Sequence, residues 1–290
     1  MKRICTLLAV IFGLLPCRLP AADPAPFKAV VIGSGAPMIL IPGLASGGNV
    51  WDGAVAHFKG QYQCHVLTLA GFAGQPAIDG PFLEKVRDGV VKYIHDQKLQ
   101  RPVIIGHSLG GMMAYWVAEA APADVGPIIV LDGLPFFSAM MDPDATEDSV
   151  KPMGEQMKSM YAGLGAEQYV QNNHQFLAAM ITDKTNVDKV AALGDKSNPK
   201  AVGQAFYDLV THDLRPKLNL IQSPLLLIGS DLTAPDDNAR ASIHKAYADQ
   251  IAAVPRHKLV FAPKAKHFIQ LDEPEFFYSQ ADAFLKENKR

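Results

Sequence analysis

The sequence predicts an α/β fold in which a mostly parallel central sheet has helices on both faces. Short runs rich in Val, Ile and Leu recur along the 290 residues, at 27–32, 37–41, 65–69, 102–105, 127–131, 224–228 and 258–261. Several of these runs are apolar at successive positions, which is typical of strands buried on both faces. Segments with helical spacing separate them, and this alternation favours parallel strands joined by helices.

The elements follow in order from the first two runs. A Gly33-Ser34-Gly35-Ala36 link separates these runs, so we expect an antiparallel hairpin at the start of the sheet. Residues 82–97 repeat apolar side chains near helical spacing, and 109–120 and 275–287 are further predicted helices. These helices should cover the strands.

The strand–helix alternation pauses between about 136 and 220. Several possible helices in this range are rich in methionine, with Met140, Met141, Met153, Met157, Met160 and Met180. Methionine fills irregular gaps in apolar cores and also lines adaptable binding surfaces, so both uses stay open. We therefore expect residues 23–290 to form a single domain with a helical cap at about 136–220.

The amino terminus has the pattern of a secretory signal peptide. Lys2 and Arg3 precede an apolar run at 4–15, and cleavage near Ala22 would remove residues 1–22. The run is shorter than the roughly 20 residues that a membrane-spanning helix needs, so no stable membrane anchor is expected. The mature chain would keep only Cys64 and could form no internal disulfide. We expect a secreted or periplasmic protein.

The composition and the motifs that the sequence lacks argue against several classes of binding partner. The 27 Lys and Arg residues are balanced by 29 Asp and Glu, a formal charge of −2 that offers no broad basic surface for nucleic acid. Gly33-Ser34-Gly35 lacks the third glycine of a dinucleotide fingerprint, and the chain has no His-Glu-x-x-His motif for zinc. We expect neither a metal nor an organic cofactor, and the sequence favours no particular oligomeric state.

The most informative motif is Gly-x-Ser-x-Gly around Ser108. Residues 103–111 read V-I-I-G-H-S-L-G-G, so a short apolar strand leads through the motif into a helix-compatible stretch. Gly106 and Gly110 lack the side chains that would collide in so sharp a turn. Ser108 can then project above the sheet as a nucleophile.

A serine nucleophile needs a base, and the base needs an acid to orient it. His267 follows the last predicted strand and is the expected base, whereas His107, next to the serine, should point elsewhere. Asp231 follows the penultimate strand and is the leading acid; the alternatives are Asp132, Asp236 and Asp237. Ser108, Asp231 and His267 then meet at the carboxyl ends of parallel strands.

With these motifs the chain resembles the α/β-hydrolase superfamily, on residues 106–111 (G-H-S-L-G-G) and 266–274 (K-H-F-I-Q-L-D-E-P). The resemblance implies an eight-stranded, mostly parallel core with a variable cap, and a Ser108, Asp231 and His267 triad. Pro42-Gly43-Leu44 resembles the family's oxyanion loop, which implies that the backbone amides of Leu44 and Leu109 form the oxyanion hole.

The predicted function is a secreted serine hydrolase acting on a small-molecule substrate. A carboxylesterase for a small or medium-sized apolar ester, working through an acyl-Ser108 intermediate, is the leading hypothesis. The same residues also suit a thioesterase, amidase, C–C hydrolase or perhydrolase. A non-catalytic binding protein on the same scaffold is the alternative outside the enzyme class.

Overall fold

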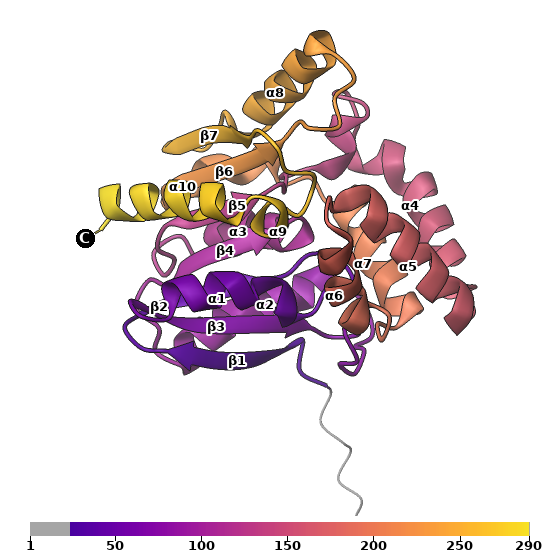
Figure 1. The fold of residues 1–290 in the computed structure, drawn as a ribbon, viewed down its shortest axis with the longest axis horizontal. Helices are drawn as coiled ribbons and strands as arrows, with labels where there is room; N and C mark the ends of the chain where they lie inside the picture. Colours follow the sequence, from indigo (N-terminus) through magenta and orange to yellow (C-terminus); the bar gives the residue numbers. More distant parts are fainter. Residues whose placement is uncertain (1–23, 290) are drawn as a thin grey trace, which may run out of the picture.

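Strands β1 to β7 form one twisted sheet in a computed structural model that describes residues 24–289 (Figure 1). The sheet order is β1-β3-β2-β4-β5-β6-β7, and every neighbouring pair is parallel except β1 with β3. The strands are β1 (Phe27–Gly33), β2 (Ala36–Ile41), β3 (Tyr62–Leu69), β4 (Val103–His107), β5 (Ile128–Leu131), β6 (Leu225–Ser230) and β7 (His257–Ala262). The predicted fold class is confirmed, with seven strands in residues 24–289 where the family resemblance implies eight.

The predicted opening hairpin is wrong. β1 and β2 are consecutive in the chain, but β3 lies between them, antiparallel to β1 and parallel to β2. The glycine-rich link thus reverses the chain without pairing the strands that it joins. Its tightness comes from contact with the segment before β3, because a Cβ at Gly35 would lie 2.2 Å from the carbonyl oxygen of Gln61.

Helices cover both faces of the sheet. Alternate side chains of a strand point to opposite faces, so Ile39 of β2 packs with helices on one side and Met38 and Leu40 pack on the other. The first face is covered by α2 (Phe82–Asp96), α3 (Leu109–Ala120) and α8 (Asp237–Ile251). The second is covered by α1 (Asp52–Phe58), with its preceding turn η1 (Gly48–Trp51), α9 (Ile269–Asp272) and α10 (Pro274–Glu287).

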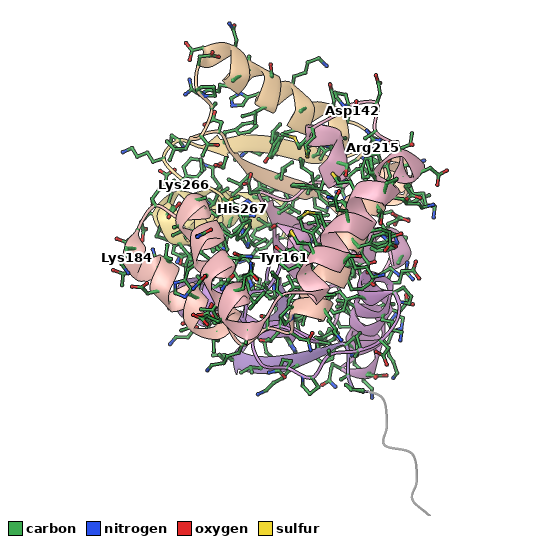
Figure 2. The ribbon with its side chains drawn as sticks, turned by 90° about the vertical axis from the view of Figure 1, so that its right-hand side faces the viewer. Asp142, Tyr161, Lys184, Arg215, Lys266 and His267 are labelled. Atoms are coloured by element: carbon green, nitrogen blue, oxygen red, sulfur yellow. The ribbon has the colours of Figure 1, made fainter. Side chains whose placement is uncertain are left out.

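The segment between β5 and β6 contains four α-helices, here called the cap helices. They are α4 (Glu147–Ala162), α5 (Ala166–Met180), α6 (Lys184–Gly194) and α7 (Pro199–Thr211), flanked by the short turns η2 (Phe137–Met140) and η3 (Arg215–Leu220). This segment spans the range in which the sequence predicts a cap. Figure 2, turned so that the cap helices face the viewer, places Tyr161 and His267 on this side of the molecule.

Local capping signals start the cap helices. Thr146 accepts a hydrogen bond from the Ser149 amide, and the Ser149 hydroxyl accepts one from the Thr146 amide, which forms a reciprocal capping box. Asn198 caps α7, which begins with a proline. α4 then packs closely on α7, because Gly203 leaves room for the Cβ of Tyr161.

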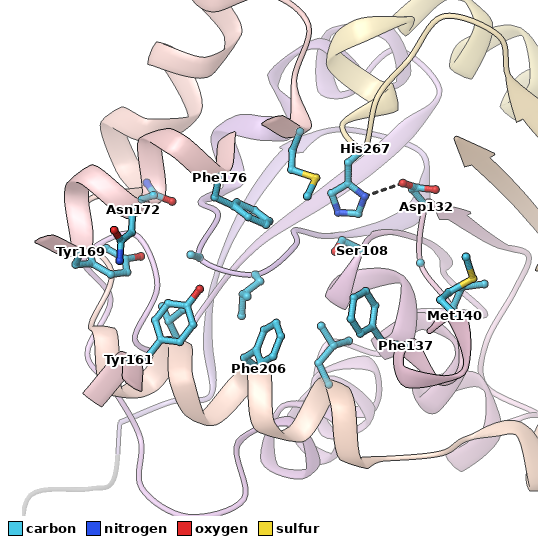
Figure 3. A pocket seen from close by; sticks show the side chains of 18 of the residues that line it. Ser108, Asp132, Phe137, Met140, Tyr161, Tyr169, Asn172, Phe176, Phe206 and His267 are labelled. Carbon is cyan, nitrogen blue, oxygen red and sulfur yellow. Dashed lines mark hydrogen bonds and ion pairs between the residues drawn. The ribbon is translucent and has the colours of Figure 1, made fainter. Parts of the chain in front are cut away.

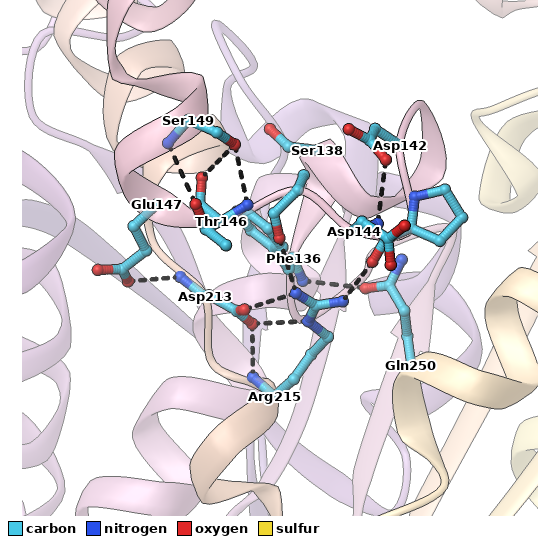
Figure 4. A network of polar contacts seen from close by, with 12 residues as sticks. Phe136, Ser138, Asp142, Asp144, Thr146, Glu147, Ser149, Asp213, Arg215 and Gln250 are labelled. Atoms are coloured by element: carbon cyan, nitrogen blue, oxygen red, sulfur yellow. Dashed lines mark hydrogen bonds and ion pairs between the residues drawn. The ribbon is translucent and has the colours of Figure 1, made fainter.

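Two polar connections hold the cap helices to the rest of the fold. Asp208 of α7 is buried and accepts hydrogen bonds from the amides of Phe82 and Leu83, both at 2.9 Å, in the first turn of α2. At the ends of the cap segment, Arg215 forms a two-point ion pair with Asp213 and lies 4.8 Å above the ring of Phe136 (Figure 4). Side chains therefore connect the segment by which the chain enters the cap, at Phe136, with the segment by which it leaves, at Asp213 and Arg215.

The predicted signal peptide, residues 1–22, lies outside the described residues. Within residues 24–289, no helix combines the length and apolarity required to traverse a bilayer.

Candidate active site

Ser108 sits at a strained turn between β4 and α3. Its φ of 55° and ψ of −119° lie in a region that non-glycine residues rarely occupy. The turn is possible because glycines flank it: a Cβ at Gly106 would lie 2.0 Å from the Gly110 carbonyl oxygen, and one at Gly110 would lie 2.1 Å from that of Ile41. The structure therefore has the elbow geometry that the motif predicts.

His267 and Ser108 line the same pocket, as the sequence predicts (Figure 3). The Nδ1 atom of His267 is 2.7 Å from an oxygen of Asp132, which follows β5. This contact fixes the imidazole and leaves its Nε2 atom available to a hydroxyl.

Asp132 is itself held by two further donors. Its second oxygen accepts hydrogen bonds from the Tyr247 hydroxyl at 2.6 Å and from the Ser230 amide at 3.0 Å. Burial, and secondly the Asp132 carboxylate, raise the pKa of Tyr247 well above its usual value, so this hydroxyl stays a donor. Next in the chain, Gly133 packs on the elbow, where a Cβ would lie 2.6 Å from the Ser108 carbonyl oxygen.

The prediction that Asp231 is the acid partner of His267 is wrong. Asp231 instead accepts from Nε2 of His244 at 2.7 Å and lies 3.3 Å from Nε of Arg240, both on α8. Asp231 does not reach His267 because of the path of the chain after β6. Ser230 is the residue whose polar groups face inward, with its amide donating to Asp132 and its hydroxyl donating to the Ala265 carbonyl.

Of the three alternative acids, Asp132 is the one beside His267. Asp236 caps α8 by accepting from the Ala239 amide, and Asp237 pairs with Arg240. The sequence could indicate Asp132 as a candidate acid because, like Asp231, it follows an apolar strand. Its two further donors, the Tyr247 hydroxyl of α8 and the Ser230 amide of β6, are distant in the sequence, and no local motif reveals them.

The two amides expected to form an oxyanion hole both adjoin Ser108. Leu44 lines the pocket and Leu109 is the first residue of α3, at the positive end of the helix dipole. Neither amide donates a hydrogen bond within residues 24–289. Gly43 brings the loop close, because a Cβ there would lie 3.2 Å from that of Ser108. The arrangement can receive a developing oxyanion.

His107 supports His267 through the backbone. Its ring is fully buried, its Nε2 lies 3.1 Å from the His267 carbonyl oxygen, and its ring centroid is 4.7 Å from that of His267. Burial first, and the nearby His267 second, lower the pKa of His107 well below its usual value, so the ring is neutral. Sequence reasoning placed this side chain away from the serine but missed its partner.

The pocket is a cavity of about 290 Å³ between the sheet and the cap helices. Its walls are mostly apolar, and no Lys, Arg or Glu from residues 24–289 lines it. From the core come Leu44, Ala45, Ser108, Asp132, Gly133, Leu134, Tyr247 and His267, and from the cap segment come Phe137, Met140, Tyr161, Tyr169, Asn172, Asn173, Phe176, Met180, Val202, Phe206 and Leu209. Two of the six cap methionines, Met140 and Met180, thus reach the pocket. No cluster of three potential metal ligands occurs in the described part of the chain.

A family model described as "Alpha/beta hydrolase family" matches residues 38–280, which is most of the chain. The chain belongs to the alpha/beta hydrolase family. A pimeloyl-[acyl-carrier protein] methyl ester esterase of Nitrosomonas europaea is 28% identical over 264 residues, covering 87% of this chain and 96% of the relative.

Solved structures share the fold of this alpha/beta hydrolase. A hydrolase from Pseudomonas aeruginosa superimposes with a TM-score of 0.74 at 18% identity, over 89% of this chain and 94% of that one. A thermophilic esterase from Thermogutta terrifontis gives a TM-score of 0.73 at 17% identity, over 91% and 94%.

Proposed function

We propose that this protein is a carboxylic ester hydrolase with Ser108 as nucleophile, His267 as base and Asp132 as the acid that orients it. The observation that carries the proposal is the contact of 2.7 Å between Asp132 and Nδ1 of His267, in the pocket that also contains Ser108. The esterase relative from Nitrosomonas europaea supports a carboxylic ester as the bond cleaved.

In this mechanism, His267 accepts the Ser108 proton as the oxygen attacks the ester carbonyl carbon. The amides of Leu44 and Leu109 stabilise the negative charge that develops on the carbonyl oxygen. The C–O bond to the alcohol breaks, the alcohol leaves with the proton from His267, and an acyl-Ser108 ester remains. Water, deprotonated by His267, then attacks this ester and releases the acid.

The pocket supports an uncharged substrate of small or medium size. Its volume of about 290 Å³ is just below the range of roughly 300–1,000 Å³ for small-molecule sites. The aromatic side chains of Phe137, Phe176 and Phe206 provide apolar walls. An anionic group would be desolvated there without a Lys or Arg partner.

The mechanism is tested with a fluorophosphonate probe and a series of p-nitrophenyl esters of increasing acyl length. We expect the native protein to be labelled and to hydrolyse the shorter esters, and we expect Ser108→Ala to lose both properties. Ser138→Ala is a matched control, because Ser138 donates to the Val210 carbonyl outside the pocket. A native protein that neither labels nor hydrolyses any ester would favour the non-catalytic alternative.

We also propose that the mature protein acts outside the cytoplasm. The support is the sequence alone, with Lys2 and Arg3 before an apolar run and Ala22 near the expected cleavage point. Expression of the full chain in a bacterial host, followed by fractionation and amino-terminal sequencing, should give a periplasmic protein starting near Asp23. Recovery from the cytoplasm with the first 22 residues intact would contradict this assignment.

A further inference from the structure

The pocket extends well beyond the reacting groups. Figure 3 shows Ser108 and His267 at one end and Tyr161, Tyr169 and Asn172 at the other. Phe176 and Phe206 lie between the two ends, and Val202 and Met180 also line the cavity. A substrate chain that reaches the far end therefore crosses an apolar section first.

The far end differs from the middle because it contains hydrogen-bonding groups. The hydroxyl of Tyr161 points into the pocket and has no side-chain or backbone partner among the described residues. Burial raises the pKa of Tyr161, so this hydroxyl is protonated and can both donate and accept. A donor or acceptor on a ligand can therefore pair with this hydroxyl.

Asn173 adds an acceptor of defined orientation. Its Nδ2 donates to Asp195 at 2.8 Å, which directs the amide, and Oδ1 accepts no hydrogen bond from the described residues. Asn173 is buried and lines the pocket. An Oδ1 atom in this position accepts a hydrogen bond from a donor on the ligand.

The charge behind this end selects against an anion. Asp195 lies directly behind Asn173 and also accepts from Nε2 of His174 at 2.9 Å. No Lys or Arg from residues 24–289 lines the pocket to offset a ligand carboxylate. A ligand group that both donates and accepts but has no charge fits Tyr161 and Asn173 best.

We propose that Tyr161 and Asn173 bind a neutral hydroxyl or carboxamide at the end of the substrate chain remote from the ester bond. The inference rests on the proposed function for the bond that is cleaved, and it adds a polar terminus to the apolar chain. It makes Tyr161 and Asn173 determinants of specificity that touch the substrate away from the reacting atoms.

The test measures binding to the Ser108→Ala variant by calorimetry, so that no ester is consumed. The acyl series consists of methyl butanoate, hexanoate and octanoate, each unsubstituted, with a terminal hydroxyl or with a terminal carboxylate. The alkoxy series consists of butyl, hexyl and octyl acetates with the same three termini. We expect the hydroxyl form of one chain length to bind about 5- to 10-fold more tightly than the unsubstituted form, as one additional hydrogen bond predicts. The carboxylate form should bind more weakly than both.

Tyr161→Phe in the Ser108→Ala background should abolish this preference, measured as the ratio of the affinities for the hydroxylated and unsubstituted forms of the same chain length. Tyr207→Phe is the matched control, a tyrosine on α7 that does not line the pocket, and it should keep the preference. Equal affinity for unsubstituted and hydroxylated forms in both series, tighter binding of the carboxylates, or a preference that survives Tyr161→Phe would each overturn the inference. Turnover and labelling of the native protein decide the proposed function separately, because the binding measurement requires no reaction.

Discussion

Two carboxylates follow adjacent strands of the same sheet, and each contacts a histidine at 2.7 Å. Asp132 binds Nδ1 of His267, whose side chain is 21% exposed and faces the pocket. Asp231 binds Nε2 of His244, which is 42% exposed and stacks on Phe261. The distance is the same in both pairs, so distance alone does not identify a catalytic pair.

The difference lies in which ring nitrogen is used and in what surrounds the carboxylate. Asp132 leaves Nε2 of His267 free for a substrate-side hydroxyl, whereas Asp231 occupies the Nε2 atom of His244. Asp132 also accepts from Tyr247 inside the fold, whereas Asp231 pairs with Arg240, a side chain 44% exposed. Ion pairs with such exposed groups contribute little to stability, typically about 0–1 kcal/mol.

The largest expected difference in activity is between the variants in which one or the other histidine is replaced by glutamine. His267→Gln removes the base, so we expect kcat/KM for p-nitrophenyl butyrate to fall by about 10⁴-fold or more. His244→Gln removes an imidazole that does not line the pocket and should leave activity within about threefold of the native value. Comparable losses in the two variants would show that the His244 pair takes part in the reaction.

Replacing the two carboxylates by amides should give a difference in activity that is nearly as large. Asp132→Asn replaces the acceptor of His267 with an amide and disturbs its tautomer, so we expect kcat to fall by about 10³- to 10⁴-fold. Asp231→Asn should retain activity within about threefold, because Asp231 contacts α8 and not His267. Steady-state kinetics of the two isosteric variants measure the contrast, and a larger loss in Asp231→Asn would restore Asp231 as the acid.

Tyr247 provides a smaller, more selective test of the environment around Asp132. Tyr247→Phe deletes the donor 2.6 Å from the carboxylate, and a hydrogen bond to a charged group is worth about 1.5–3 kcal/mol. We therefore expect kcat to fall by about 10- to 100-fold. The KM for a short ester should change little, which separates orientation of Asp132 from the pocket-lining role of Tyr247. An unchanged kcat would mean that His267 and the Ser230 amide suffice to position Asp132.

His107, which lies against His267, should give the smallest effect, and that effect is on stability. Burial holds its native pKa well below the usual value of about 6.5, so below that pH the unfolded chain binds a proton that the folded chain does not. The free energy of unfolding should therefore be retained above pH 6.5 and fall as the pH is lowered. One such group contributes at most about 1.4 kcal/mol per pH unit.

Urea unfolding of His107→Gln at several pH values measures this contribution. The variant should be less stable at neutral pH, because it loses packing against Phe268, but its stability should fall less steeply on acidification. His95→Gln is the control, since His95 is exposed and pairs with Asp124 at the surface. A slope for His107→Gln as steep as that of the native protein would contradict the assignment.

Local signals account for what the sequence predicted correctly. Gly106 and Gly110 mark the turn at Ser108 because neither position has room for a Cβ, and His267 follows from its place after the last strand. The strand assignments depend on apolar runs that are also local. Sequence reasoning therefore found the fold class, and it singled out a serine and a histidine that line the same pocket.

The misses depend on contacts between distant segments. Asp132 and Asp231 have the same sequence environment, a carboxylate after an apolar strand, and the inward turn of Ser230 toward Asp132 separates them. The insertion of β3 between β1 and β2 is likewise a choice among long-range pairings. Neither choice leaves a mark in the residues nearest in sequence.

The contact between Gly133 and the Ser108 carbonyl has a consequence for how such a protein can diversify. The backbone segments that carry Asp132 and Ser108 are in direct contact, since the residue after Asp132 packs against the backbone of Ser108. Insertions after position 133 can lengthen or replace the cap segment that covers the cavity, while Ser108, Asp132 and His267 keep their mutual spacing. Substrate range and bond-breaking chemistry can accordingly change at independent rates.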